Sequence, residues 1–195
     1  FVATDSDGDS VVVDAGAYIR VQNDVPVNLD QPAVQVGRVE EDALQGGNRE
    51  TNWQQASETI VATDIAGLVR AGADAPVSIS FNLAGIDEEA TGLTQNGVSI
   101  FWNVNGEALE GVIHGTGSAG VDTVIFTLTA NQQDDDYTFT LLGNIDHDTD
   151  GDLSTGNGDG FSERLSLEGV FVATDSDGDS VVVDAGAYIR VQNDV

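Results

Sequence analysis

The sequence predicts an all-β fold, and three observations lead to that prediction. Apolar residues recur at every second position in several separate segments, which is the spacing of half-buried strands. Turn-forming sequences separate these segments, and the 23 glycines suit turns and bulges better than helices. Finally, the first 25 residues recur without substitution as the last 25, which indicates a repeated domain.

Each alternating segment is expected to form one strand. In residues 13–21, for example, Val13, Ile19 and Val21 face the core while Asp14 and Arg20 face away from it. One or two helical turns are expected only at residues 63–70. Short strands at this spacing are typical of an Ig-like antiparallel β-sandwich, for which we expect two sheets and seven to nine strands. The other predicted strands lie in residues 77–83, 98–104, 124–128 and 137–141.

The repeated segment sets the domain boundaries. Phe1–Val25 is identical to Phe171–Val195, so the offset is 171 − 1 = 170 residues. We interpret the chain as part of a tandem array, in which residues 26–195 form one complete repeat and residues 1–25 are the C-terminal hairpin and linker of the preceding one. Pro26 marks the boundary, because proline cannot donate to a ladder and stiffens a connection. The alternative is an end duplicated by cloning.

A hairpin formed by residues 1–25 alone would expose several apolar side chains, namely Val11, Val13, Ile19 and Val21. We therefore expect it to pack against a neighbouring molecule in place of the missing copy. There it would either complete that molecule's sandwich or continue the string of repeats.

The charge of the chain excludes two classes of partner. There are 34 acidic residues against six basic ones, all arginine, and the net charge is −28. Nucleic acids and anionic membranes both require a cationic surface, so neither is an expected partner. Two explanations for the acidity compete, namely a halophilic solvation shell and specific Ca²⁺ sites. The carboxylates cluster with Gly and Asn in short runs, which favours sites. With no cysteine, the chain has no disulfide and no cysteine-ligated metal.

The first candidate Ca²⁺ site is the run Asp146-His-Asp148-Thr-Asp150-Gly-Asp152. Alternating Asp followed by Gly is typical of the front half of a calcium loop, because alternate residues of a tight loop turn their carboxylates to one centre. The bidentate Glu that closes a helix–loop–helix calcium loop is replaced by Asn157. A different carboxylate would have to complete the shell, and a solvated acidic loop is the alternative.

The second candidate is the Asp-Gly-rich turn that occurs in both copies of the repeated segment. Three alternating carboxylates make it either a Ca²⁺ turn or a plain Asp-Gly hairpin turn. Its carboxylates are those of Asp5, Asp7 and Asp9 and their copies Asp175, Asp177 and Asp179.

The third candidate lies at the domain boundary. Asp24 and its copy Asp194 precede the start of a repeat, and Glu41 and Asp42 follow after one predicted strand. If that strand returns the chain to the same pole, a cation bridging Asp24, Glu41 and Asp42 would hold two domains at a fixed angle. Without the cation the carboxylates would repel each other and the joint would hinge. The alternative is an acidic rim without a bound ion.

Three segments carry a resemblance to a known family. They are "ATDSDGDSVVVDAGAYIRVQNDVPV", "VEEDALQGGN" and "FTLTANQQDDDYTFTLLGNIDH". Together they resemble the extender repeats of giant bacterial RTX adhesins, which are type I-secreted surface proteins. The junction "VQNDVPV" also resembles the calcium-binding linkers of cadherin-like modules. The loop "DHDTDGDLSTGNGDGFSE" departs from the family by being richer in Asp, which predicts an additional ion.

The resemblance implies a role as one copy in a β-sandwich stalk. In that family the stalk lies outside the bacterial cell, between an outer-membrane anchor and distal ligand-binding domains, and Ca²⁺ folds and stiffens it. The expected function is therefore a structural extender, with identical repeats head to tail as its partners and no direct membrane contact. The alternative is an adhesive module that binds carbohydrate, peptide or a like domain, for which Trp53 in polar surroundings is the feature to test. No catalytic motif is recognisable, so an enzyme is not expected.

Overall fold

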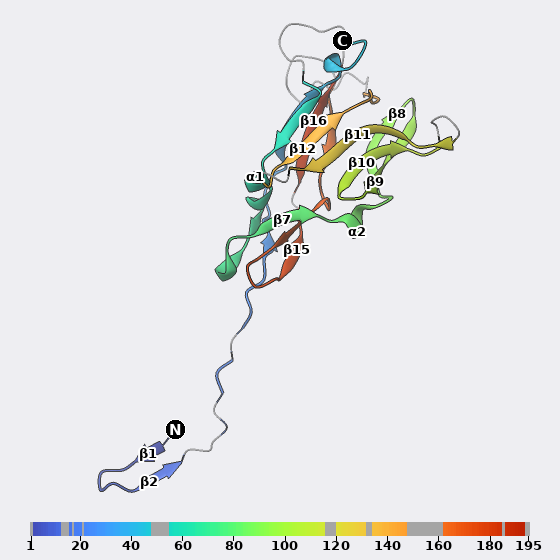
Figure 1. Cartoon of the computed structure of the whole chain (residues 1–195). Coiled ribbons are helices and arrows are strands. Elements are labelled where there is room, and N and C mark those ends of the chain that lie inside the picture. The colour runs from blue at the N-terminus through green and yellow to red at the C-terminus, as the bar shows by residue number, and fades with distance from the viewer. Residues whose placement is uncertain are drawn as a thin grey trace.

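The computed structural model describes residues 2–12, 16, 18–20, 22–47, 55–115, 120–131, 134–147, 162–184 and 186–193. In Figure 1 a body of packed sheets carries an extended segment at one end, and this segment leads to a two-stranded hairpin at the N-terminus. The hairpin consists of β1 (Val2–Thr4) and β2 (Ser10–Val12). The C-terminus lies at the opposite end of the body.

One layer of the body is a six-stranded antiparallel sheet with the order β5-β12-β11-β10-β9-β8. Two Asn-Gly sequences, at residues 96–97 and 105–106, form turns that join neighbouring strands of this sheet. At the first turn, Asn96 and Gly97 have φ values of 53° and 75°, which suits the tight hairpin between β8 and β9. The strands are β5 (Ser57–Ile60), β8 (Ala90–Gln95), β9 (Val98–Asn105), β10 (Ala108–Ile113), β11 (Thr123–Ala130) and β12 (Tyr137–Leu141).

A bulge in this sheet interrupts the simple alternation predicted for residues 124–128. Strict alternation places Ile125 on the outer face, yet Ile125 is buried together with Phe126. The register shifts from Gly111 opposite Phe126 to Val112 opposite Val124, which leaves Ile125 as the extra residue. Gly111 permits this packing, because a Cβ at that position would overlap the Phe126 ring.

The second layer contains two three-stranded sheets, β13-β16-β4 and β15-β14-β7. All pairs are antiparallel except β16 with β4, which is parallel and so departs from the predicted antiparallel pattern. These two strands lie near the two ends of the repeat, so no hairpin constrains their direction. The strands are β4 (Val34–Glu40), β7 (Ser78–Phe81), β13 (Ser162–Ser166), β14 (Phe171–Thr174), β15 (Ser180–Val182) and β16 (Ala187–Gln192).

The remaining elements are short. The expected helical segment is confirmed in part, because α1 (Ala62–Ala66) gives way to β6 (Val69–Arg70), which pairs with β3 (Val27–Asn28). A second helix, α2 (Leu83–Ile86), and 3₁₀ turns at Glu41–Ala43 and Gly72–Asp74 complete the structure. The described residues contain sixteen strands, more than expected, because several are only two or three residues long. None of their helices is long and apolar enough to cross a membrane.

One hydrophobic core joins the layers and confirms the all-β sandwich. Trp102 packs edge-on against Phe126, and Phe126 contacts Phe139 with a centroid separation of 5.3 Å. Tyr137 meets Phe171 at 4.8 Å and so connects the six-stranded sheet to β14. The C-terminal copy of the repeated segment is therefore part of this core.

Candidate metal centre

The loop between β14 and β15 is folded by its own first aspartate. Asp175 Oδ1 accepts hydrogen bonds from the backbone N–H groups of Gly178 and Asp179, at 3.1 and 2.9 Å. The backbone of Asp175 also bonds to that of Asp179 at 2.9 Å. Gly178 has a φ of 102°, a conformation that suits glycine. The Asp-Gly turn signal in the sequence is thus confirmed as a hairpin turn.

A carboxylate from a distant part of the chain joins this loop. Asp74 follows β6 in a 3₁₀ turn, and its carbonyl accepts a hydrogen bond from the Ser176 N–H at 3.1 Å. One carboxylate oxygen from each of Asp74, Asp175 and Asp177 lies within 4.8 Å of the others. Oxygen atoms at such spacing suit a hard cation such as Ca²⁺, whose oxygen ligands lie at about 2.3–2.6 Å.

Asp175 provides the buried member of this group. Only 6% of Asp175 is exposed, and among the described residues no N–H or hydroxyl group donates to its Oδ2. A buried charged oxygen without a partner is costly, so it calls for a proton or a cation. A hydrogen bond with the Asp175 carboxyl raises the pKa of Asp177, and burial and the charges of Asp175, Asp179 and Asp74 raise it further. The electrostatics of the loop thus favour an added positive charge.

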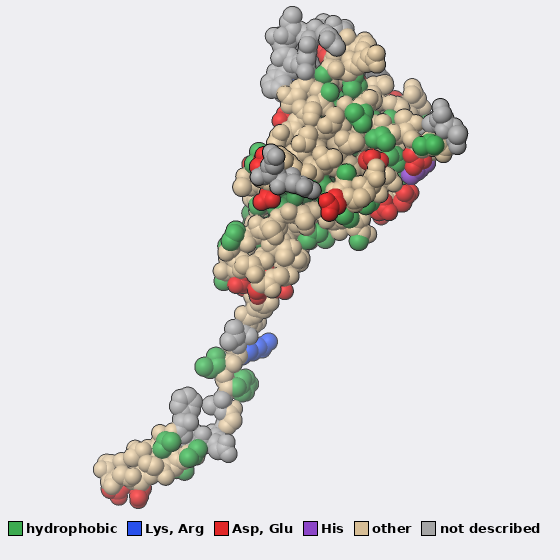
Figure 2. All heavy atoms as spheres, viewed as in Figure 1, with side chains coloured by type: hydrophobic (Ala, Val, Ile, Leu, Met, Phe, Trp, Pro, Cys, Tyr) green, Lys and Arg blue, Asp and Glu red, His purple; other side chains and the backbone are tan. Residues whose placement is uncertain are grey.

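The linker between residues 1–12 and the body contacts the end of the body that carries Asp74, Asp175 and Asp177, which we call the acidic pole. The Asn23 side-chain amide donates to Asp179 Oδ2, and Asp24 Oδ2 accepts from the Ala73 N–H at 2.8 Å. Gly72, with a φ of 74°, allows this approach, since a Cβ there would overlap the Asp24 carboxylate. Pro26, which ends the linker, is buried. In Figure 2 acidic side chains gather at this tip of the body and again at the tip of the hairpin.

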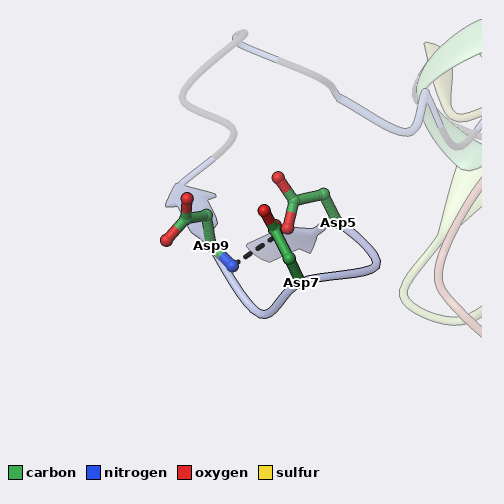
Figure 3. Close-up of side chains that lie close together, drawn as sticks. All are labelled: Asp5, Asp7 and Asp9. Carbon is green, nitrogen blue, oxygen red and sulfur yellow. Dashed lines mark hydrogen bonds between the residues drawn. The ribbon is translucent and has the colours of Figure 1, made fainter.

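The N-terminal copy of the loop has the same internal bonds but a different setting. Asp5 Oδ1 accepts from the N–H groups of Gly8 and Asp9 at 3.1 and 2.9 Å. Asp5, Asp7 and Asp9 are all exposed and lie close together, as Figure 3 shows. A hydrogen bond from the Asp7 carboxyl lowers the pKa of Asp5. No carboxylate from elsewhere in the described residues completes this group.

The structure does not bring Asp24 together with Glu41 and Asp42. Asp24 lies beside Ala73, whereas Glu41 and Asp42 follow β4 at its far end. There the buried Glu41 Oε1 accepts from the Ile145 N–H at 2.6 Å and lies 3.2 Å from His147 Nε2. The seven residues of β4 separate the two places, so within one chain they do not form one site.

Asp146 is held by donors of its own chain. Its Oδ2 accepts from Thr94 Oγ1 at 2.6 Å and from the Gly97 N–H at 2.7 Å, and its Oδ1 accepts from the Asn96 N–H at 2.8 Å. The Thr94 bond, followed by the Gly97 bond, lowers the pKa of Asp146. Asp146 therefore anchors the β8–β9 turn. Its predicted partners Asp148, Asp150 and Asp152 lie outside the described residues, as do Asp194 and Trp53.

Two contributors to the pole were missed by sequence reasoning. Asp74 was not identified, because nothing in its local pattern relates it to a loop so far along the chain. Its only local signal is the turn sequence Gly72-Ala-Asp74-Ala-Pro76. Asn23 was recognised as part of the boundary but not as a contact of Asp179.

Comparison with known proteins places the chain in one family. A family model described as "Domain of unknown function (DUF5801)" matches residues 37–185. No curated protein and no solved structure matches the chain.

Proposed function

The chain belongs to DUF5801, a family described only as a domain of unknown function, so we propose its function from the resemblance of its sequence to adhesin repeats together with the geometry of the acidic loop. The proposed function is that of a structural extender repeat in a long adhesin exported by type I secretion to the bacterial cell surface. Its partners are identical repeats, head to tail. Ca²⁺ bound where one repeat meets the linker from the preceding one fixes the angle between them.

The buried Asp175 Oδ2, which has no donor among the described residues, is the observation that carries this proposal. The oxygens nearest to it that could share a cation are those of Asp74 and Asp177. These three residues would hold the ion, and water or neighbouring oxygens would complete its shell. Asp24 and Asp179, at the same end of the body, are exposed.

The position of the linker supports a role in stiffening. Asn23 contacts Asp179, which ends the carboxylate loop, and Asp24 contacts Ala73, which precedes Asp74. A cation held by Asp74, Asp175 and Asp177 would therefore tie together the two segments on which the linker rests. Without it, the mutual repulsion of these carboxylates loosens the same two segments.

In an array, both poles of the repeat would meet at each junction. Gln192, at the end of β16, lies opposite Glu40, at the end of β4. Residues 193–195 have the sequence of residues 23–25, so they would lead to the next repeat as Asn23 and Asp24 lead to this one. The buried Glu40 and Glu41 of one repeat would then lie near the acidic pole of the next. This arrangement makes every junction a place of concentrated negative charge.

The test is the distribution of distances between the hairpin and the body. The chain has no cysteine, so Ser6→Cys and Thr129→Cys provide two unique sites for spin labels on the full chain. We expect a narrow distance distribution in Ca²⁺ and a broad one in EDTA. The substitution Asp177→Asn should keep the distribution broad in Ca²⁺, whereas the matched Asp7→Asn should leave the wild-type narrowing intact.

Two outcomes would count against this function. If Mg²⁺ or NaCl narrows the distribution as much as Ca²⁺, charge screening explains the effect and the acidic runs are a solvation shell. If Asp177→Asn and Asp7→Asn behave alike, the ion does not sit at Asp74, Asp175 and Asp177. The adhesive alternative rests on Trp53 and stays a prediction for ligand screening.

A further inference from the structure

Two side chains that can bind a metal ion lie buried at the end of β4 that is remote from Asp24. Glu41 begins the 3₁₀ turn after β4, and His147 follows β12 in the chain. The His147 side chain is 4% exposed and that of Glu41 is 5% exposed, and Glu41 Oε1 lies 3.2 Å from His147 Nε2. The two residues are 147 − 41 = 106 positions apart, so only the fold brings them together.

The geometry of this pair is not that of a hydrogen bond. Among the described residues, neither ring nitrogen of His147 has a hydrogen-bond partner, although the Glu41 oxygen is close to one of them. In a hydrogen bond the acceptor lies near the axis of the N–H bond, so Glu41 Oε1 lies to the side of that axis. Ligand atoms that share a tetrahedral Zn²⁺ at about 2.0–2.2 Å also lie side by side, about 3.3 Å apart.

The imidazole of His147 is therefore a buried polar group whose bonding capacity is unused. A neutral imidazole offers one nitrogen as a donor and the other as an acceptor, and neither has a partner in the described part of the chain. Burying such groups without a partner is costly, and so is burying a carboxylate without a positive charge. A metal ion on the ring nitrogen would satisfy the imidazole and neutralise Glu41 at once.

The residues before His147 hold it in place. The Ile145 N–H donates to Glu41 Oε1 at 2.6 Å, and the Asp146 N–H donates to the Thr94 carbonyl at 2.7 Å. The Asp146 carboxylate is itself held by the β8–β9 turn. Because these contacts are present without an ion, binding would order few further groups, and such preorganisation favours affinity.

A cleft beside His147 contains a further carboxylate. Glu163 lies on the inward face of β13, two positions before the buried Leu165. Among the described residues, no third His or carboxylate ligand atom lies within 4.8 Å of both Glu41 and His147, so the Glu163 side chain would have to turn across the cleft to join them. The cleft has a volume of about 270 Å³ and is lined by Gly92, Leu93, Thr94, Asp146, His147 and Glu163.

We propose that Glu41 and His147 bind a first-row divalent metal ion of the Zn²⁺ type, with Glu163 as the third ligand and water in the remaining position. An imidazole nitrogen suits Zn²⁺, whereas Ca²⁺ takes oxygen ligands. The site thus differs in its metal and its place from the acidic pole, and it does not rest on the function proposed above. The ion would join β4, the segment after β12, and β13, and so would connect the two layers of the sandwich.

The other histidine supplies a matched control. His114 is partly exposed, and its ring nitrogens already lie 3.1 Å from Asp122 and 3.2 Å from Glu88. The test is calorimetric titration of the full chain with Zn²⁺ in millimolar Ca²⁺, which keeps sites made of oxygen ligands occupied. We expect one Zn²⁺ for each chain, in wild type and in His114→Ala alike.

Substitution of each proposed ligand should weaken Zn²⁺ binding at least about tenfold. The variants are His147→Ala, Glu41→Gln and Glu163→Gln. Glu41→Gln keeps an acceptor oxygen for the Ile145 N–H, so it removes the charge while preserving that hydrogen bond. Circular dichroism shows whether each variant is folded.

A second measurement needs no substitution and stays decisive if His147→Ala does not fold. In NMR spectra of the wild-type imidazoles, Zn²⁺ should shift the ring signals of His147 and leave those of His114 unchanged. A shift of His114 alone would place the ion at the exposed histidine and overturn the proposal.

The titrations can overturn it as well. If no Zn²⁺ binds in the presence of Ca²⁺, Glu41 and His147 form a buried ion pair and nothing more. If the affinity is unchanged in folded His147→Ala, Glu41→Gln or Glu163→Gln, the ligand set proposed here is wrong. Because Ca²⁺ at the acidic pole is read from the Asp177→Asn distance distributions, failure of one proposal leaves the other standing.

Discussion

The two copies of one 25-residue sequence lie in opposite environments in this molecule. Both form the same hairpin with the same register and the same Asp-Gly loop. In the first copy all described residues of the hairpin are exposed, whereas in the second copy β14 and β16 are central strands. Local sequence thus specifies the hairpin, whereas burial of its side chains requires the other strands of the sandwich to pack against it.

The same contrast separates the two acidic loops. Asp175 is buried beside Asp74 and Asp177, while among the described residues its copy Asp5 is grouped with Asp7 and Asp9, all exposed. The burial of a carboxylate among others is therefore not a property of the loop alone. It depends on the rest of the fold, which brings Asp74 from the turn after β6 to Asp175 and Asp177.

The largest expected effect comes from truncating one core residue in each copy. Ile189→Ala should lower the free energy of unfolding by about 2–5 kcal/mol, because it leaves a cavity between the layers. Ile19→Ala should change it by less than about 0.5 kcal/mol, because the side chain is exposed. Urea unfolding of both variants measures the difference. Equal losses would mean that the first copy is also packed in solution.

Alkaline pH should weaken the packing of Tyr137 against Phe171, which belongs to the C-terminal copy of the repeated segment. Tyr137 packs on Phe171 and donates a hydrogen bond to the Ile79 carbonyl at 2.8 Å. Burial, followed by the charges of Asp135 and Asp136, raises the pKa of Tyr137 from 10.0 to about 12. The folded state favours the neutral phenol of Tyr137. Tyr137 therefore stabilises the fold fully below pH 10, and this contribution is lost as the pH rises from 10 to 12. The loss should reach about 2–3 kcal/mol.

The composition makes this titration easy to interpret. The chain has no lysine and no cysteine, so the side chains that most often compete with tyrosine in alkaline titrations are absent. Unfolding midpoints at pH 9–12 should fall for wild type and much less for Tyr137→Phe. If the unfolding midpoint of Tyr137→Phe falls with pH as steeply as that of wild type, another group causes the loss of stability.

A smaller effect is expected where the linker meets the body. Gly72→Ala requires a φ of 74° from alanine and places a methyl group against the Asp24 carboxylate. The left-handed conformation alone costs about 1 kcal/mol. We expect that loss in stability, together with faster hydrogen exchange of the Ala73 amide as Asp24 is displaced. Asp24→Asn keeps an acceptor oxygen and should preserve the slow exchange; if it does not, the charge of Asp24 rather than its position protects the amide.

The smallest effect compares the two acidic loops without metal. In EDTA, Asp175→Asn should raise the free energy of unfolding by up to about 1 kcal/mol, because it removes one of three mutually repelling charges while keeping the Oδ1 acceptor. The matched Asp5→Asn should leave the stability of the body unchanged, because the hydrogen bonds described for Asp5 stay within its own hairpin. Thermal melts of both variants decide this, and equal rises would point to a general relief of net charge.

The strand pattern was predictable wherever one face of a strand is buried. The copy of residues 13–21 is not the single strand that was expected, because β15 ends at Val182 and β16 begins at Ala187. The expected burial is confirmed, since Val183, Ile189 and Val191 are buried. It was wrong at Ile125, because a bulge depends on how two strands fit and not on the spacing in one of them. The parallel pairing of β16 with β4 was missed for the same reason, since strand direction across a whole domain has no local signal.

The sequence by itself determined the hairpins, the turns and the clustering of carboxylates, because these depend on neighbours only a few residues apart. Tertiary structure alone decided that Asp74 joins Asp175 and Asp177, that Asp24 lies far from Glu41, and that one copy of an identical segment is buried while the other is exposed. Packing brings together residues that no sequence pattern relates. The free energy of burying an apolar side chain is realised only where a complementary surface exists.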